Sequence, residues 1–188
     1  EITVEGMERA EKILANVPKG AERAAASALN RGLSRVKTGA IKKVKEVYTV
    51  QSSALSAATK TRINKASAGN LVGEITFSGK KIPLYKFHVT PKAPGGRPLV
   101  RAGQMKGGGE PFYHAFIAQM HSTGHIGIFE RKEKAIAEGK RFPIEEIMGS
   151  AMAQMVKNEK VIEPLEEEAQ KLVNERLEHE IERLLGGY

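Results

Sequence analysis

The stretch Pro18–Tyr48, PKGAERAAASALNRGLSRVKTGAIKKVKEVY, is the longest amphipathic segment of the chain. Its apolar residues recur every three or four positions and basic residues fill much of the remainder, which predicts one long helix with a buried face. The apolar positions are Ala21, Ala25, Ala28 or Leu29, Val36, Ala40, Ile41, Val44 and Val47. Gly32 and Gly39 interrupt the pattern, and glycine costs about 1 kcal/mol relative to alanine inside a helix. Each glycine therefore predicts a close helix contact or a bend, and a bend would divide the segment into two shorter helices.

A second amphipathic segment, acidic in composition, lies in residues 158–188. Pro164 suits the first turn of a helix, and the glutamates at 166–168 follow near the positive end of its dipole. The stripe spaced by three and four comprises Leu165, Ala169, Leu172, Val173, Arg176, Leu177, Ile181 and Leu184. The glycine pair at 186–187 ends the helix. Such a stripe must pack either on a body formed by residues 1–157 or on a neighbouring subunit.

Between the two helices the apolar periodicity changes to two, which is typical of strands. TRINKAS (residues 61–67) and LVGEITFSG (71–79) alternate around the turn SAGN (67–70) and predict a hairpin. KIPLYKFHVT (81–90) predicts a third strand. Pro83 belongs at the start of that strand or on a sheet edge, because proline donates no hydrogen bond to a ladder.

Residues 91–111 hold ten glycines or prolines among 21 positions and predict an extended loop, of a kind that is usually functional or disordered. Within it only PLVRAGQM (98–105) resembles a strand. FYHAFIAQM (112–120) is a mixed apolar run, and HSTGHIGIFERK (121–132) supplies a further strand. The predicted fold class is α+β: a small, mostly antiparallel sheet of four or five strands over about 61–131, packed against the long N-terminal helix, with helices at the C-terminus.

Two shorter helices are predicted from serines that can cap them, because a side-chain oxygen accepts from the unpaired N–H groups of a first helical turn. Ser52 and Ser53 precede a short helix at 54–59. Ser150 precedes another in IMGSAMAQMVKN (147–158).

The amino-acid composition excludes several kinds of site and several classes of protein. The chain has no cysteine, which excludes disulfides, thiolate metal sites and a cysteine nucleophile. It has no apolar run long enough to cross a bilayer, and charges occupy the N-terminal stretch where a signal peptide needs apolar residues; we expect neither a membrane nor an exported protein. Residues 49–110 hold ten basic and two acidic side chains, whereas 145–188 hold five and eleven. This asymmetry predicts attraction to a polyanion, or head-to-tail attraction between copies.

Candidate catalytic and metal-binding residues are few. His121 and His125 stand four apart, with Glu130 nearby, but that spacing aligns two zinc ligands only on a helix. Gly124 and Gly127 make this segment a poor helix, no third ligand follows from the pattern, and His114 adds little. The segments HSTGH, GKKIP and KGGG match neither a nucleophile elbow nor a phosphate-binding loop. We expect no catalytic, metal or cofactor site.

Basic residues gather in the middle of the chain: Lys80, Lys81, Lys86, Lys92, Arg97, Arg101 and Lys106. They could face DNA phosphates, where each neutralised phosphate releases counterions and makes binding depend on salt. They could equally form a solvated face, or meet the acidic helix of an adjacent subunit. We favour the solvated or subunit interpretation over DNA contact, and expect no base-specific recognition.

GHIGIFER (124–131) followed by RFPIEEIMGSAMAQM (141–155) resembles the signature region of the prophage minor tail protein Z family of phage virion proteins. The matching positions are Gly124, His125, Gly127, Phe129, Glu130, Arg131, Pro143 and Ile144. Upstream, ALNRGLSRVKTGAIKKV, INKAS, GEITFSGKKIPLYKF and the KGG loop are also similar in order and spacing, so the resemblance covers most of residues 20–157. The family's proline between Gly149 and Ser150 is missing, and the acidic tail after Asn158 adds nothing to the resemblance.

The resemblance implies a structural role without a reaction. It implies completion of the tail or its joining to the head at the neck, as a ring of subunits around the DNA channel, with Glu130 and Arg131 as a fold-fixing or inter-subunit pair. We expect a homo-oligomer, a hexamer by analogy, that assembles in the host cytoplasm, stays in the virion and contacts other neck and tail proteins. Two alternatives remain: a non-specific DNA-binding protein acting outside the virion, and a small hydrolase using His121, His125 and Glu130.

Overall fold

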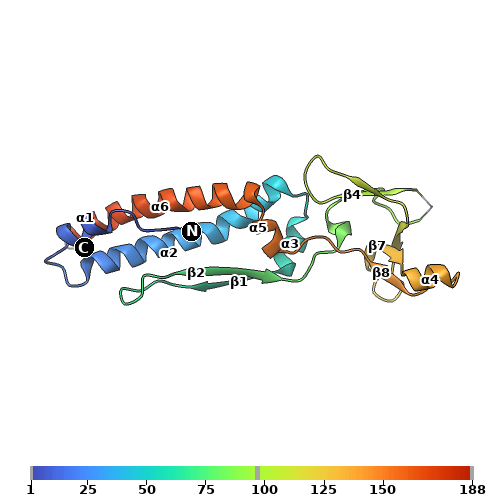
Figure 1. The fold of residues 1–188 in the computed structure, drawn as a ribbon, viewed down its shortest axis with the longest axis horizontal. Coiled ribbons are helices and arrows are strands. Elements are labelled where there is room, and N and C mark those ends of the chain that lie inside the picture. Colours follow the sequence, from blue (N-terminus) through green and yellow to red (C-terminus); the bar gives the residue numbers. More distant parts are fainter. Residues whose placement is uncertain (1, 96–97, 187–188) are drawn as a thin grey trace. The chain divides into compact units, whose positions relative to one another are not determined.

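The computed structural model describes residues 2–95 and 98–186 (Figure 1). These residues form two compact units: unit 1 holds the described residues of 1–43, 60–77 and 156–188, and unit 2 holds 44–59 and 78–155. The chain combines helices with three small antiparallel sheets, so the predicted α+β class is confirmed. The expected division of the chain after residue 157 stays a prediction.

The core of unit 1 is formed by three helices, α1 (Met7–Ile13), α2 (Gly20–Val47) and α6 (Glu159–Leu185). The segment predicted at 18–48 is one continuous helix, α2. Its buried face is mostly alanine, which lets α6 lie close beside it (Figure 1). The buried cluster comprises Ala10, Leu14, Ala21, Ala24, Ala25, Ala28, Val173, Leu177 and Ile181. Burial of an apolar stripe along both helices stabilises them far more than propensity does.

The two glycines inside α2 mark close contacts with α6. A Cβ added at Gly32 would lie 2.5 Å from Val173 Cγ2, and one at Gly39 would lie 2.9 Å from Leu165 Cδ1. Both distances are shorter than carbon atoms tolerate, so a side chain at either position would displace the α6 side chain that it meets or the helix itself. Because position 32 faces residue 173 and position 39 faces residue 165, the helices run antiparallel.

Helix α6 begins earlier than expected. Asn158 is its N-cap, and the Asn158 side chain accepts a hydrogen bond from Lys160 N at 3.0 Å. Pro164 therefore lies inside the helix, not in its first turn; the prediction of the start was wrong because an asparagine cap followed by tertiary packing outweighs the single backbone bond that proline removes. Gly186 caps the C-terminus through its N–H to Glu182 O, and Gly187 lies outside the described residues.

The predicted hairpin is formed by β1 (Thr59–Asn64) and β2 (Glu74–Gly79). Its turn closes where expected, because Ser67 and Asn70 exchange backbone hydrogen bonds of 2.8 and 3.0 Å. Asn30 of α2 attaches this connection to the helix: its amide nitrogen donates to Ala66 O at 2.9 Å, and its amide oxygen accepts from Ala66 N at 3.0 Å.

Replacing Asn30 with alanine should lower the free energy of unfolding by about 1–3 kcal/mol, because both polar backbone groups of buried Ala66 lose their partner. Urea unfolding measures the loss, and the Ala66 amide should exchange with deuterium faster. Asn16→Ala is the control, since Asn16 is exposed; equal effects of the two substitutions would contradict the prediction.

Unit 2 contains two three-stranded sheets in place of the expected single sheet. One has the order β3 (His88–Thr90), β4 (Val100–Gly103), β5 (Glu110–Phe112). The other has the order β6 (Ala115–Gln119), β7 (Ile126–Arg131), β8 (Ile144–Glu146). The prediction of one sheet of four or five strands was wrong, because apolar alternation identifies strands without fixing which of them pair.

Several local predictions also differ from the structure. Residues 81–90 are not one strand: Leu84–Lys86 is a 3₁₀ turn that buries both Leu84 and Phe87, and only β3 is extended. Helix α3 (Ser52–Ala58) starts after Gln51 and receives no side-chain cap, so its serines lie within it. Helix α5 (Met152–Val156) begins after Ala151. The N–H of Ala151 donates a hydrogen bond to Gln154 Oε1 at 2.9 Å. Ser150 N donates to Gln104 Oε1 at 2.7 Å. The predicted serine caps were wrong: Ser52 and Ser53 lie inside α3, and the side chain at the start of α5 that binds backbone N–H is Gln154.

Candidate functional site

The signature segment forms β7, the central strand of the β6–β7–β8 sheet. Its register places Phe129 opposite Phe116 on β6 and opposite Glu146 on β8, so these three side chains share a sheet face with His125. His125 Nε2 lies 2.7 Å from Glu146 Oε1, and the His125 ring meets that of Phe129 edge-on at 6.4 Å between centroids. The segment is a packed structural strand, with Phe129 and Ile128 buried on opposite faces.

Two glycines make this arrangement possible. Gly124 has φ of 68°, a left-handed conformation that glycine adopts without strain, and it turns the chain into β7. Gly127 leaves room on the His125 face: a Cβ there would lie 2.5 Å from Glu146 Oε1 and 3.0 Å from the Phe129 ring. The glycine is thus needed for the carboxylate to reach the imidazole.

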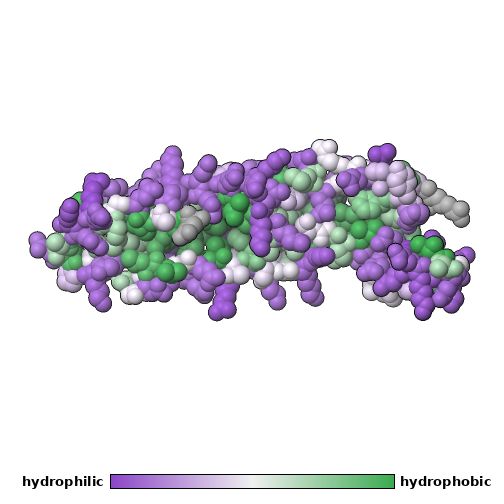
Figure 2. Space-filling model, viewed as in Figure 1, coloured by the Kyte–Doolittle hydropathy of each residue, from purple (hydrophilic) through white to green (hydrophobic). Residues whose placement is uncertain are grey.

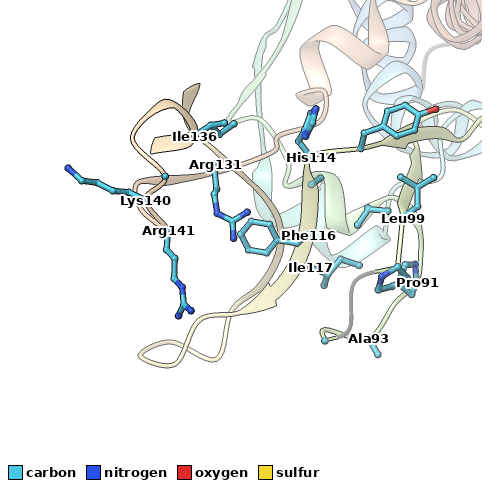
Figure 3. A pocket seen from close by; sticks show the side chains of 16 residues that line it. Pro91, Ala93, Leu99, His114, Phe116, Ile117, Arg131, Ile136, Lys140 and Arg141 are labelled. Atoms are coloured by element: carbon cyan, nitrogen blue, oxygen red, sulfur yellow. The ribbon is translucent and has the colours of Figure 1, made fainter. Parts of the chain in front are cut away.

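Glu130 and Arg131 do not pair with each other, because successive residues on a strand point to opposite faces. Arg131 lies over the Phe116 ring (Figure 3). Its guanidinium carbon is 5.4 Å from the ring centroid. Glu130 is exposed. Ile144, the first residue of β8, pairs with Arg131 in register, and the carbonyl of Pro143 accepts from Lys132 N at 3.2 Å. A contact of Glu130 or Arg131 with another subunit stays a prediction.

The hydrolase candidates are not assembled into a site. His125 and Glu130 lie on opposite faces of β7, since an odd number of positions separates them. His121 and His114 are exposed. The imidazole of His125 is paired with the carboxylate of Glu146. Among the residues that the structure describes, no group of three or more histidines and carboxylates could hold a metal ion. No helix in the same residues is both long and apolar enough to cross a membrane.

Six of the seven predicted basic residues belong to the described part of unit 2; Arg97 lies outside the described residues. Lys80, Lys81, Lys92, Arg101 and Lys106 are exposed. Lys86 is half-buried, with its ammonium 5.9 Å from the centroid of the Tyr85 ring. Within the described ranges none of the six forms an ion pair with a carboxylate. Their charges are available to an external anion.

Some carboxylates of the acidic helix α6 form ion pairs inside unit 1. Glu168 lies 2.8 Å from Lys43 Nζ and 3.1 Å from Arg35, both on α2. The hydrogen bond from Lys43, aided by that from Arg35, lowers the pKa of Glu168 below its usual value. Opposite charges therefore accompany the apolar contact between the helices.

Glu180 is a buried carboxylate in the same interface. It accepts from Ser27 Oγ at 2.9 Å and lies 2.8 Å from Arg183 and 3.7 Å from Arg176. Burial, the largest single influence, raises the pKa of Glu180, but hydrogen bonds from Ser27 and Arg183 and the charges of both arginines together lower it. The carboxylate is held ionised in a mostly apolar contact.

These two lowered pKa values predict a loss of stability in acid. A carboxylate with a lower pKa when folded stabilises the fold above its unfolded pKa, near 4.5, and this contribution disappears as the pH falls through the folded value. The stability difference between the wild type and Glu180→Gln should therefore shrink between neutral pH and pH below about 4.5. Urea unfolding at several pH values tests this, and a stability difference that stays constant over this range would contradict it.

Two open cavities lie one in each unit. A cleft of about 880 Å³ in unit 2 is lined by Tyr113, His114, Arg131 and the exposed residues Ile136 and Arg141, among others (Figure 3). A groove of about 780 Å³ in unit 1 is lined mainly by apolar side chains of α2, β2 and α6 and of the N-terminal segment. In neither cavity do the lining residues form an arrangement that is typical of a catalytic site.

Several residues that organise unit 2 were missed by sequence reasoning. Glu146, the partner of His125, and Gln104, which binds Ser150 N, lie far from their partners in sequence. Thr49 joins three segments, because its hydroxyl donates to Gly103 O at 2.7 Å and accepts from His88 N at 2.9 Å. No pattern marks such residues, since their roles depend on long-range contacts.

Comparison with known proteins gives one match. The family described as Prophage minor tail protein Z (GPZ) matches residues 4–187. No curated protein and no solved structure matches the chain. The match includes the β7 signature and extends through α6, which the sequence resemblance had not reached. Because it covers nearly the whole chain, the chain belongs to the prophage minor tail protein Z family and is a structural protein of a phage tail.

Proposed function

We propose that this tail protein acts at the neck, where a homo-oligomeric ring of its copies surrounds the DNA channel and completes the tail or joins it to the head. The proposal rests on charged side chains that form no ion pair within the described residues, with the basic ones in unit 2 and the acidic ones on α6 of unit 1. The six described basic residues at 80–106 of unit 2 form no ion pair with a carboxylate, and Glu159, Glu163 and Glu167 on α6 are exposed and form none within the described residues.

The three glutamates are spaced by four residues and lie along one side of α6. Because both signs occur on one chain, the acidic row of one copy can meet the basic surface of the next. Such a contact is head-to-tail, and it closes into a ring when the rotation between copies divides a full turn. We propose a hexamer, on the strength of the family resemblance alone.

Cryo-electron microscopy of purified virions tests the position of the protein. The expected result is a ring of this chain at the head–tail junction. Density for the chain elsewhere in the tail would overturn the neck assignment, and its absence from virions would overturn the whole proposal.

Charge reversal tests the contact between copies. The triple substitution Glu159→Lys, Glu163→Lys and Glu167→Lys should lower the titre of infectious phage by at least about ten-fold in a complementation assay, because like charges then face each other. Glu8→Lys with Glu11→Lys, on the exposed side of α1, is the control. An unchanged titre for the triple variant would contradict the charge-based contact.

Non-specific DNA binding outside the virion is the second candidate, because the same six cations suit phosphates. A titration of the isolated protein against duplex DNA at several salt concentrations separates the two. Tight binding with a steep salt dependence by the lone chain favours the DNA-binding candidate, whereas weak binding favours the assembly role.

A further inference from the structure

The groove of unit 1 has an apolar lining that is partly open to solvent. Leu33 and Val36 on α2 and Leu165 on α6 are the buried part of this lining, and Ile75 and Phe77 on β2 are half-buried. Val72 at its edge is 70% exposed. Figure 2 shows apolar surface over α2 in the same view as Figure 1. A contiguous apolar groove on a soluble chain is typical of a surface that another protein covers.

Unit 2 carries an exposed apolar element that matches this groove. The residues between β7 and β8, 132–143, form an arm that contains α4 (Glu133–Ala137) and is closed at its base by the bond from Lys132 N to Pro143 O. On this arm Ile136 is 55% and Phe142 is 68% exposed. Two large apolar side chains in water on one short arm are typical of residues that insert into a partner.

The charges on the arm and around the groove indicate which partner would dock. The arm carries four basic and two acidic side chains. Lys132 and Lys140 pair with Glu145 and Glu138, which leaves the exposed Lys134 and Arg141 for a partner. The groove includes Glu74 and Glu166 in its lining, and Glu74 is exposed. A basic apolar arm thus complements an acidic-edged apolar groove.

We propose that the arm 132–143 of one copy docks in the unit 1 groove of a second copy, with Ile136 and Phe142 against its apolar floor and Lys134 and Arg141 near Glu74. This rests on the proposed homo-oligomer and adds an apolar contact to the charged one proposed above. The contact is heterologous, since different surfaces meet, and it therefore links copies in series as a ring requires.

Engineered disulfides test the contact directly, because the chain has no cysteine of its own. Virions are assembled with the double variant Val72→Cys and Phe142→Cys, both at exposed positions, and are then oxidised. The expected result is a ladder of cross-linked multimers on non-reducing gels that reducing agent collapses. Cross-links confined to single chains would overturn the second-copy assignment, and the absence of any cross-link would overturn the docking.

The matched control is Val72→Cys with Tyr113→Cys, because Tyr113 is an aromatic residue of unit 2 that is 76% exposed and lies outside the arm. This control should give no multimers. In the complementation assay Phe142→Ser should lower the phage titre at least about ten-fold, whereas Tyr113→Ser should not. Equal titres would contradict the proposal.

Failure of this inference can be told apart from failure of the proposed function. If microscopy shows the ring at the neck but the 72–142 cross-link does not form, the docking is wrong and the ring stands. If the chain forms no ring, the proposed function fails as well.

Discussion

Replacing Glu180 with alanine is expected to lower the free energy of unfolding by about 1–3 kcal/mol, because Ser27 Oγ and Arg183 Nε lose the carboxylate that accepts their hydrogen bonds. Arg176 would lose its nearest anion, and its Nε is already buried without a hydrogen-bond partner among the described residues. Ser27 Oγ would lose its acceptor in the same contact.

Urea unfolding measures the effect. Glu182→Ala is the control, because Glu182 is exposed on the same helix and its loss should change stability by less than about 0.5 kcal/mol. Glu180→Gln should fall between the two, since its amide oxygen still accepts from Ser27 while the charge is lost. A loss below about 1 kcal/mol for Glu180→Ala would show that the cluster contributes little to the contact between α2 and α6.

The substitution Gly127→Val should destabilise unit 2 by about 3 kcal/mol, because overpacking alone typically costs 1–3 kcal/mol and the His125–Glu146 bond is lost in addition. The new Cβ would overlap Glu146 Oε1 and press on the Phe129 ring. The strand would have to move away from β8 or expel the carboxylate.

Thermal unfolding and the protection of β7 amides from hydrogen exchange measure this effect. Gly109→Ala is the matched control, because a Cβ there meets nothing within 4 Å and alanine at an unstrained position is neutral or slightly stabilising. Adding Glu146→Ala to Gly127→Ala should recover part of the loss from Gly127→Ala alone. No recovery would mean that the Phe129 ring, and not the carboxylate, requires the glycine.

The signature segment shows how far sequence reasoning reaches. The strand at 126–131 and its structural character were predictable from alternation and from the family resemblance, and the family is confirmed. The partner of His125 was not, since Glu146 is 21 residues away and only the β7–β8 register brings it near. The basic residues at 80–106 were identified as a group, but whether ion pairs already neutralise them is decided by long-range packing.

The sequence by itself determined the two long helices, the hairpin at 59–79 and the mixed fold class, because apolar periodicity and turn residues are local properties that each segment carries with it. Only the tertiary structure decided that Gly32 and Gly39 are close contacts and not bends, that the eight strands of the described residues form three sheets, and that Asn158 starts α6. These outcomes depend on which segments contact one another. Those contacts are determined by the summed burial and hydrogen bonding of residues far apart in the chain.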